Sequence, residues 1–397
     1  MTRWRPQRYR AGAVAKGISP QIVEHALRTA EITHAVNGKL PPILTLRHLA
    51  EYTGVDYGTL RSVARRSDEV SYRVFRIRKR PAHKGERRFR VIAVPSAPLM
   101  QIQRWINKRV LMHADVHPAS VAFAEDDNIR EAAAVHCQCK WLIKLDVLNF
   151  FESISEISIY KVFRSLGYQP LISFELSRIC TRISKSTANR SSERWINFRP
   201  GSAVDTDGVS SISGMTIRAY DEYRIGHLPQ GAPTSPMLAN LAMRELDQNL
   251  TEVAKVHGLF YTRYADDLTF STREDSDRRK CQHIIGQIYR ALANVGLSPN
   301  RCKTRIIPPG GRKIVLGLLV TGPEPRLMRD FKARLRQHFY YLERPNFGPS
   351  QHARKLGFSS VIGFRHHLAG LVSYAAQIEP EYGQRMRNRL KNIKWPI

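Results

Sequence analysis

The sequence has few features of a secreted or membrane-embedded protein. It has five cysteines among 397 residues. They are odd in number and lack the spacing of zinc sites, so reduced thiols in a cytoplasm are expected. No signal peptide or internal repeat is recognisable. The longest apolar runs, such as residues 314–320, fall far short of the roughly 20 residues that a membrane span requires. We therefore expect no membrane partner.

Acidic residues are scarce relative to basic ones. The chain has 63 Lys and Arg against 34 Asp and Glu, which gives a formal net charge of +29. From Arg326 to the end, 14 basic residues face 4 acidic ones, an excess of ten. Such a surface attracts phosphate backbones, with an affinity that falls steeply as salt rises. Leu327, Phe331, Leu335 and Phe339 follow at four-residue steps, which predicts a helix with one apolar face.

Two adjacent carboxylates stand out against this basic background. Asp266 and Asp267 end the tetrapeptide Tyr264–Asp267, between apolar segments at 259–263 and 268–270. The segments predict two strands joined by a tight turn. Neighbouring carboxylates repel each other, and their partial burial is costly unless a hard divalent cation, most simply Mg²⁺, neutralises them. A solvated Asp-Asp turn is the alternative interpretation.

Asp146 supplies a third carboxylate. It follows the short apolar run 141–145, which predicts a strand, and it precedes a segment that turns into a helix. Three carboxylates can hold the two metal ions that clamp the attacking and leaving oxygens of a phosphoryl transfer. A strand-end aspartate facing a hairpin aspartate pair is typical of palm-type nucleic-acid polymerases.

At this point the chain resembles a reverse transcriptase over roughly residues 70 to 325. Three motifs carry the resemblance, at residues 144–151, 228–236 and 264–267. It implies an α+β, right-hand polymerase fold with fingers, a palm of antiparallel sheet plus helices, and a helical thumb. It also implies RNA-directed DNA polymerase activity, a nucleotidyltransfer reaction. Asp146, Asp266 and Asp267 would be catalytic and, with Val147, would hold two Mg²⁺ ions.

The resemblance also assigns residues around the incoming nucleotide. Phe151 matches the aromatic ring that lies beneath the sugar and excludes a 2′-hydroxyl, which implies that dNTPs are the substrates. Gln230 and Gly231 match the loop at the nascent base pair, where a residue without a side chain lets the backbone pass closely. The alternatives are an ordinary turn for the loop and a core position for the ring, which we favour for Phe150.

Two basic strands are predicted upstream, at 72–79 and 90–95, around a polar loop. They resemble the finger strands of the family, where a basic side chain meets the triphosphate. Arg90 matches the family position best, with Arg78 and Lys79 as further nucleotide-binding candidates. Solvated charge at a strand edge is the alternative for the last two.

Lys303 closes a short basic motif at 296–304. The family places this lysine near the departing pyrophosphate, where a protonated amine can act as a general acid. An ordinary surface charge is the competing interpretation.

Within the family, the chain is most similar to retron reverse transcriptases. Val320-Thr321-Gly322 resembles the Val-Thr-Gly signature of that group. His136 matches the end of its Asn-Ala-x-x-His segment, although Ala132 replaces the asparagine. The residues expected to contact RNA are Val320, Thr321, Gly322, His136, Arg329 and Arg336.

Retron resemblance implies a dedicated partner RNA. A cognate noncoding RNA would serve as template and primer, and synthesis from a 2′-hydroxyl would leave a branched RNA–DNA product, msDNA. An effector protein and antiphage defence in a bacterial cytoplasm are implied as well. The alternatives are a group II intron-like or abortive-infection reverse transcriptase, or a catalytically silent RNA-binding scaffold. The sequence leaves the oligomeric state open.

We predict three regions along the chain. Residues 1–70 form a basic arm and a helical region, 71–325 form fingers and palm with a polar insertion at about 181–227, and 326–397 form a basic helical thumb. The arm is expected to be disordered and to touch RNA. Residues 45–61 have the pattern of a helix-turn-helix, which we expect to pack on the fingers, with DNA reading as the alternative.

Overall fold

The computed structural model describes residues 4–67, 71–78, 89–125, 127–184, 224–345 and 347–396. The chain folds into two compact units. The first unit comprises Met1–Glu125, Val147–Asn249 and Ala291–Ser298, and the second comprises Asp126–Asp146, Leu250–Arg290 and Pro299–Ile397. Both units are assembled from separate stretches of chain, and the three sequence regions remain a prediction.

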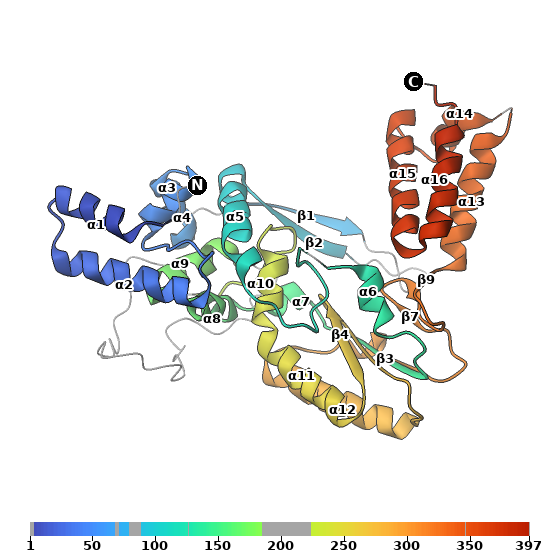
Figure 1. Ribbon diagram of the computed structural model, residues 1–397, viewed down its shortest axis with the longest axis horizontal. Helices are drawn as coiled ribbons and strands as arrows, with labels where there is room; N and C mark the ends of the chain where they lie inside the picture. The colour runs from blue at the N-terminus through green and yellow to red at the C-terminus, as the bar shows by residue number, and fades with distance from the viewer. Residues whose placement is uncertain are drawn as a thin grey trace. The chain divides into compact units, whose positions relative to one another are not determined.

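The first unit begins with a helical hairpin. Helices α1 (Pro6–Ala15) and α2 (Pro20–Val36) lie side by side (Figure 1). Each has proline in its first turn, where the missing N–H costs nothing. Ala13, Val23 and Leu27 bury a small apolar cluster between them. The expectation of a disordered arm is therefore wrong for residues 6–15, because this cluster gives α1 a partner to pack against.

The predicted helix pair near residue 50 is confirmed. Helices α3 (Leu46–Thr53) and α4 (Tyr57–Arg65) meet at Gly54, whose φ of 67° is left-handed and suits a residue without Cβ. Leu49 and Leu60 have no exposed surface. The pair packs into the first unit, as we expected.

The two basic strands are confirmed as an antiparallel ribbon. Strand β1 (Tyr72–Arg78) pairs with β2 (Phe89–Pro95), from Tyr72 opposite Pro95 to Arg78 opposite Phe89. Helix α5 (Ala97–Arg109) and the 3-10 turn η1 (Leu111–His113) follow. The polar loop between the strands, together with Lys79, lies outside the described residues.

Short helices complete the first unit. They are α7 (Phe150–Ser153), α8 (Glu156–Ser165), α9 (Pro170–Cys180) and α10 (Ser235–Ala242). After α9, Arg182 and His227 exchange two backbone hydrogen bonds of 3.0 Å. Residues 185–223 of the predicted insertion lie outside the described residues.

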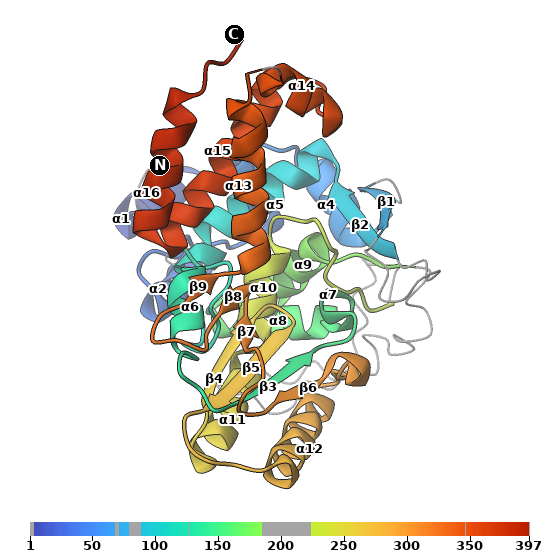
Figure 2. The ribbon, with the colours of Figure 1, turned by 90° about the vertical axis from the view of Figure 1, so that its right-hand side faces the viewer.

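A four-stranded antiparallel sheet forms the centre of the second unit, in the order β4-β5-β3-β6 (Figure 2). Its strands are β4 (Phe260–Tyr264), β5 (Asp267–Thr272), β3 (Trp141–Asp146) and β6 (Arg305–Ile307). Helices α11 (Arg244–Val256) and α12 (Arg278–Asn294) flank the β4–β5 hairpin in sequence. A boundary between the two units falls inside each of these helices. The predicted strand at 141–145 and the predicted hairpin are confirmed.

His136 connects the segment after α6 (Ile129–Ala134) to this hairpin. The ring is fully buried. Its Nε2 lies 2.7 Å from Oγ1 of Thr262 on β4, and its Nδ1 lies 2.7 Å from Oγ of Ser271 on β5. The predicted RNA contact is therefore wrong for His136, since every polar atom of the ring already has a partner inside the protein.

The C-terminal part of the second unit is a small sheet followed by a helical bundle. The strands are β7 (Ile314–Val315), β8 (Leu318–Leu319) and β9 (Arg326–Leu327), and the helices are α13 (Arg329–Glu343), α14 (Gly348–Lys355), α15 (Val361–Ile378) and α16 (Pro380–Asn392). Leu335 and Phe339 are buried on α13 as predicted, whereas Leu327 belongs to β9 and reaches the same core from there.

Helices α15 and α16 approach very closely. The two helices lie side by side in Figure 1, and a Cβ added at Gly383 of α16 would clash with the backbone of Ala376 of α15, so only glycine permits this contact. Among the described helices, none is long and apolar enough to cross a membrane.

Helices combined with antiparallel sheets confirm the predicted α+β class.

We expect His136 to make folding sensitive to mild acid. Burial, and then the charge of Lys144, lowers the pKa of His136 to about 3. Between that value and the ordinary 6.5 the unfolded chain binds more protons than the folded one, so stability falls as pH falls. From pH 7 to pH 5 this one group should cost about 2 kcal/mol. Urea unfolding at both pH values measures the loss.

His136→Gln is the informative variant, because its amide can still bond to both hydroxyls but does not titrate. The loss between the two pH values should shrink by about 2 kcal/mol relative to wild type. His366→Gln, at an exposed position of α15, is the matched control and should keep the wild-type loss. Equal losses in all three proteins would contradict the assignment.

Candidate active site

Strand pairing places two of the predicted carboxylates opposite each other. Asp146 ends β3, Asp267 begins β5, and the two are direct partners in the antiparallel register. Side chains of such partners project to the same face, with Cβ atoms about 5 Å apart. Asp266 lies beside them in the turn between β4 and β5. The three predicted aspartates are thus brought together within the second unit.

The turn itself is conformationally unusual. It contains only Ala265 and Asp266 between the closing pair Tyr264 and Asp267. Ala265 has φ of 53°, a left-handed conformation that residues with a Cβ rarely adopt. The fully buried Arg263 donates from Nη1 to the Ala265 carbonyl at 3.3 Å. Backbone strain of this kind is maintained by the surrounding structure and is common at functional sites.

The carboxylates of Asp266 and Asp267 lie in an environment that disfavours their ionised forms. Burial raises the pKa of Asp266, and the negative charge of Asp146 raises it further. Burial also raises the pKa of Asp267, although the charge of Lys144 opposes that rise. Ionised forms are therefore disfavoured here relative to water, and a cation placed among these groups would relieve the penalty.

Three neighbouring side chains hold the carboxylates. Nζ of Lys303 lies 2.7 Å from Oδ1 of Asp146, and Nζ of Lys144 lies 3.1 Å from Oδ2 of Asp267. Asn300 donates from Nδ2 to Oδ2 of Asp146 at 3.0 Å, and from its backbone N to the Asp146 carbonyl at 2.7 Å. Asp146 is consequently fixed from both carboxylate oxygens and from its backbone.

Within the part of the chain that the structure describes, no three His, Cys, Asp or Glu side chains form a group that could hold a metal ion as they stand. Instead, the ammonium groups of Lys303 and Lys144 form ion pairs with the carboxylates of Asp146 and Asp267. The donor chemistry nevertheless suits a hard divalent cation, because the three side chains offer only carboxylate oxygens and two of them are unfavourably ionised. Val147, the further predicted ligand, has an aliphatic side chain, so only its backbone carbonyl oxygen could coordinate a cation.

The predicted loop residues lie in the first unit. Gln230 donates from Nε2 to Oε2 of Glu152 at 3.2 Å, and its carbonyl accepts from the Ala93 N–H at 2.7 Å. Gly231 has φ of 107°, and a Cβ there would lie 2.9 Å from Cγ2 of Ile92. The close approach of Ile92 on β2 therefore requires glycine at position 231, independently of any nucleotide contact by the loop.

The other nucleotide-binding candidates also belong to the first unit. Phe151 is half-buried in α7, with its ring centroid 5.4 Å from that of Phe150. Phe150 is buried in the core, which confirms that expectation. Arg90 and Arg78 are exposed near paired ends of β2 and β1.

The RNA-binding candidates near the bundle differ in their exposure. Val320 has no exposed surface, so its predicted RNA contact through the side chain is wrong. Its carbonyl instead accepts from the Gln138 N–H at 3.0 Å. Thr321 is exposed and Gly322 is half-buried, while Arg329 and Arg336 are exposed on α13. These four positions remain open to a partner.

Sequence reasoning missed Lys144, Asn300 and Arg263. Lys144 could have been found, because the period of two along a strand puts it on the same face as Asp146. Asn300 lies within the basic motif that contains Lys303, but nothing local indicates that its amide reaches a residue so far away in the chain. A buried arginine beside a turn has no local sequence signal.

We expect Asp266→Asn to stabilise the protein. Because the folded-state pKa of Asp266 is raised, the ionised carboxylate costs free energy at neutral pH, and the cost disappears below the ordinary value of 3.8. The isosteric amide should raise the free energy of unfolding by about 1 kcal/mol at pH 7. Urea denaturation measures it.

Asp275→Asn is the control for this substitution, since that side chain is 87% exposed in the loop after β5. Its effect should be close to zero. A destabilised Asp266→Asn protein would show that the carboxylate is a net stabilising group, which would refute the electrostatic argument.

Known proteins share this sequence pattern. Residues 77–318 match the family described as "Reverse transcriptase (RNA-dependent DNA polymerase)". The chain is 28% identical to the Retron Ec86 reverse transcriptase of Escherichia coli, over 89% of this chain and 95% of that protein. It is 29% identical to the Retron Mx65 reverse transcriptase of Myxococcus xanthus, over 89% and 72%. For the Retron Ec83 reverse transcriptase of Escherichia coli the identity is 25%, over 81% and 89%.

The family match covers more than half of the chain and includes the β3 aspartate, the Gln230 loop and the aspartate hairpin. It accounts for the predicted right-hand polymerase fold, in which the four-stranded sheet is the palm. The chain therefore belongs to the reverse transcriptase family, the RNA-dependent DNA polymerases, and within that family it is of the retron type.

Proposed function

We propose that this protein copies a cognate structured RNA into a branched RNA–DNA hybrid, with dNTPs as substrates and two Mg²⁺ ions held by Asp146, Asp266 and Asp267. The observation that carries the proposal is the register of β3 and β5, which sets Asp146 opposite Asp267 beside the strained turn. The coarser activity, RNA-directed DNA synthesis, follows from the family.

The three aspartates would hold the ions through carboxylate oxygens, with the Val147 carbonyl as a further donor. The chemistry that Mg²⁺ supplies when bound is a lower pKa of the attacking hydroxyl and support for the departing pyrophosphate. Asn300 would keep Asp146 oriented when Lys303 leaves its carboxylate, because the two Asn300 hydrogen bonds are independent of that lysine.

Lys303 is the proposed proton donor to the pyrophosphate. Its side chain is half exposed, and its Nζ lies 2.7 Å from Oδ1 of Asp146. An ammonium group can donate a proton to a leaving group as a general acid. A triphosphate would compete with Asp146 for this ammonium group.

Nucleotide selection is proposed to rest on the first unit. Phe151 would lie beneath the sugar and exclude a 2′-hydroxyl, while Gln230 and Gly231 would border the nascent base pair. Arg90, Arg78 and Lys79 are the candidates for the triphosphate, and the exposure of the two arginines leaves them available for it.

The retron part of the proposal draws on the relatives that carry that name. It includes initiation from a 2′-hydroxyl of the RNA, msDNA as the product, and antiphage defence together with an effector protein. The exposed residues Thr321, Arg329 and Arg336 are the proposed RNA contacts, supported by the basic excess of the C-terminal region.

The deciding experiment isolates the protein from cells that carry its native locus and separates the bound nucleic acid on a denaturing gel. We expect a short DNA whose mobility changes after RNase or debranching treatment. It should be absent with Asp266→Asn and present with the control Asp275→Asn. RNA without attached DNA would contradict the branched-product proposal.

Phe151→Ala tests nucleotide selection. Loss of the ring should reduce the preference for dNTPs over rNTPs, as a ratio of kcat/KM values, by about tenfold to a hundredfold. Primer extension on a primed RNA template with single nucleotides measures it. Leu148→Ala, at an exposed position just upstream, is the control and should keep the wild-type ratio. An unchanged ratio in Phe151→Ala would remove this residue from the proposal.

A further inference from the structure

Two segments of the first unit pair in a constant antiparallel register. The Glu156 N–H donates to the Gly226 carbonyl at 2.8 Å, and the Leu228 N–H donates to the Ile154 carbonyl at 3.1 Å. Between these contacts Ser155 and His227 form an antiparallel bridge. Beyond this pairing, a side-chain hydrogen bond joins Gln230 to Glu152 of α7. We call Ile154–Glu156 and Gly226–Leu228 the paired segments.

One end of the paired segments lies at the proposed nucleotide site. Helix α7, which carries Phe151, ends at Ser153 directly before the first paired segment, and Gln230 follows the second paired segment by two residues. The pairing therefore fixes where the helix with the ring proposed to contact the sugar meets the loop proposed to border the base pair, and the Gln230–Glu152 hydrogen bond joins the two. A slip by one residue would change which side chains face each other, as it does between strands of a sheet.

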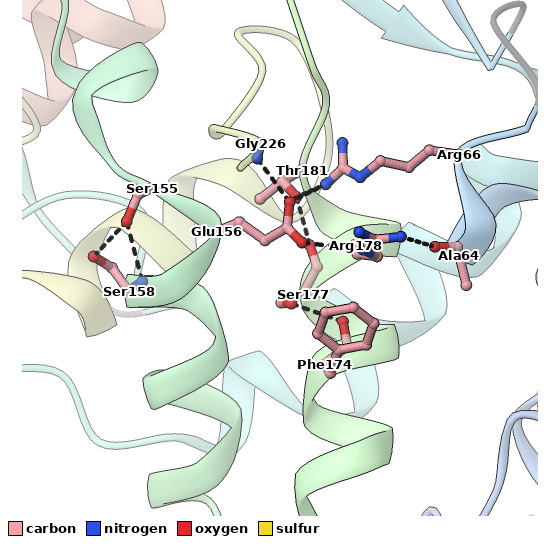
Figure 3. A network of polar contacts seen from close by, with 10 residues as sticks. All are labelled: Ala64, Arg66, Ser155, Glu156, Ser158, Phe174, Ser177, Arg178, Thr181 and Gly226. Carbon is pink, nitrogen blue, oxygen red and sulfur yellow. Dashed lines mark hydrogen bonds and ion pairs between the residues drawn. The ribbon is translucent and has the colours of Figure 1, made fainter. Parts of the chain in front are cut away.

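The carboxylate of Glu156 holds the other end (Figure 3). It is fully buried, and its Oε2 accepts from the Gly226 N–H at 2.8 Å and from the Thr181 hydroxyl at 3.3 Å. Oε2 also accepts from Arg66, and Oε1 lies 3.3 Å from Nε of Arg178. Glu156 thus binds both the N–H and the carbonyl of Gly226, one through its side chain and one through its backbone.

Gly226 has no room for a side chain at this point. A Cβ there would lie 2.5 Å from Nη2 of Arg66 and 2.7 Å from Oε2 of Glu156. Any larger residue would force the ion pair apart. The close approach explains why glycine begins the second paired segment.

The ion network also includes the N-terminal helix pair. Arg66 directly follows α4 in a left-handed conformation, with φ of 61°. Arg178 of α9 donates from Nη1 to the Ala64 carbonyl of α4 at 3.2 Å and lies over the Phe174 ring (Figure 3). Removing one member would leave a buried charge without its partner, which is strongly destabilising, so the charged groups of this network stabilise one another.

We infer that Glu156 is a positioning residue for nucleotide selection: through Gly226 it fixes the register of the paired segments, and through Arg66 it makes the N-terminal helix pair part of the nucleotide-binding apparatus. The nucleotide roles of Phe151 and Gln230 in this inference rest on the proposed function. The role of Glu156 in holding Gly226 does not.

The test compares Glu156→Gln with Arg61→Met. The amide keeps the shape of the carboxylate but loses its charge, whereas the control disrupts the Arg61–Glu175 pair between α4 and α9 and leaves Gly226 alone. Hydrogen exchange at the amides of Gly226 and Leu228 reports the register without any catalysis. Single-nucleotide extension reports KM for dNTP, kcat and the preference for dNTPs over rNTPs.

In Glu156→Gln we expect faster exchange at both amides, KM for dNTP raised about tenfold to a hundredfold, and a reduced preference for dNTPs. Arg61→Met should leave all three at wild-type values, while thermal melting verifies that both variants fold. Unchanged exchange, or faster exchange with unchanged KM and preference, would overturn the inference.

Gly226→Ala is a second variant at the opposite end of the same contact and should reproduce the Glu156→Gln pattern. A wild-type protein that extends no primer would defeat the proposed function instead. Hydrogen exchange in the same variants would then still decide whether Glu156 holds the paired segments.

Discussion

The pairing of β3 with β5 is the constraint on which the rest of the second unit depends. It forces Asp146 and Asp267 into adjacent positions despite their like charge. Lys144 and Lys303 counter that repulsion with positive charge. His136 adds a link between β4 and β5 by bonding a hydroxyl on each strand. The same pairing that makes the ionised carboxylates costly would favour cation binding, because groups held in an unfavourable charge state gain most when a cation arrives.

Much of the palm could be predicted from local patterns. Apolar runs ending in aspartate, and an acidic turn between apolar strands, determine β3 and the hairpin, because strand periodicity and turn chemistry act over a few residues. The first helix was not predicted, since its basic sequence gives little sign that Ala13 would find an apolar partner in α2. Leu327 was placed in a helix because its spacing from Phe331 fits one, although it pairs in β9.

The candidate site was predictable where a motif contains the chemistry and unpredictable where the fold brings it together. The aspartates could be found from apolar runs and turn chemistry, and Lys303 from the resemblance of its motif to the family. Asn300, Arg263 and Glu156 act through contacts that only tertiary structure creates, so a single sequence carries no signal for them. His136 and Val320 illustrate the reverse error: their motif was recognised, but burial assigns both to packing, not to RNA contact.

The backbone exchange between Arg182 and His227 has a consequence for the length of the chain between them. The two hydrogen bonds close the base of the predicted insertion at His227, the second residue of the paired segment that begins at Gly226. Lengthening a loop whose ends are already joined costs little entropy, since the cost grows only with the logarithm of its length. Changes of length between these two residues would therefore cost little free energy and leave the register of the paired segments beside Gln230 unchanged.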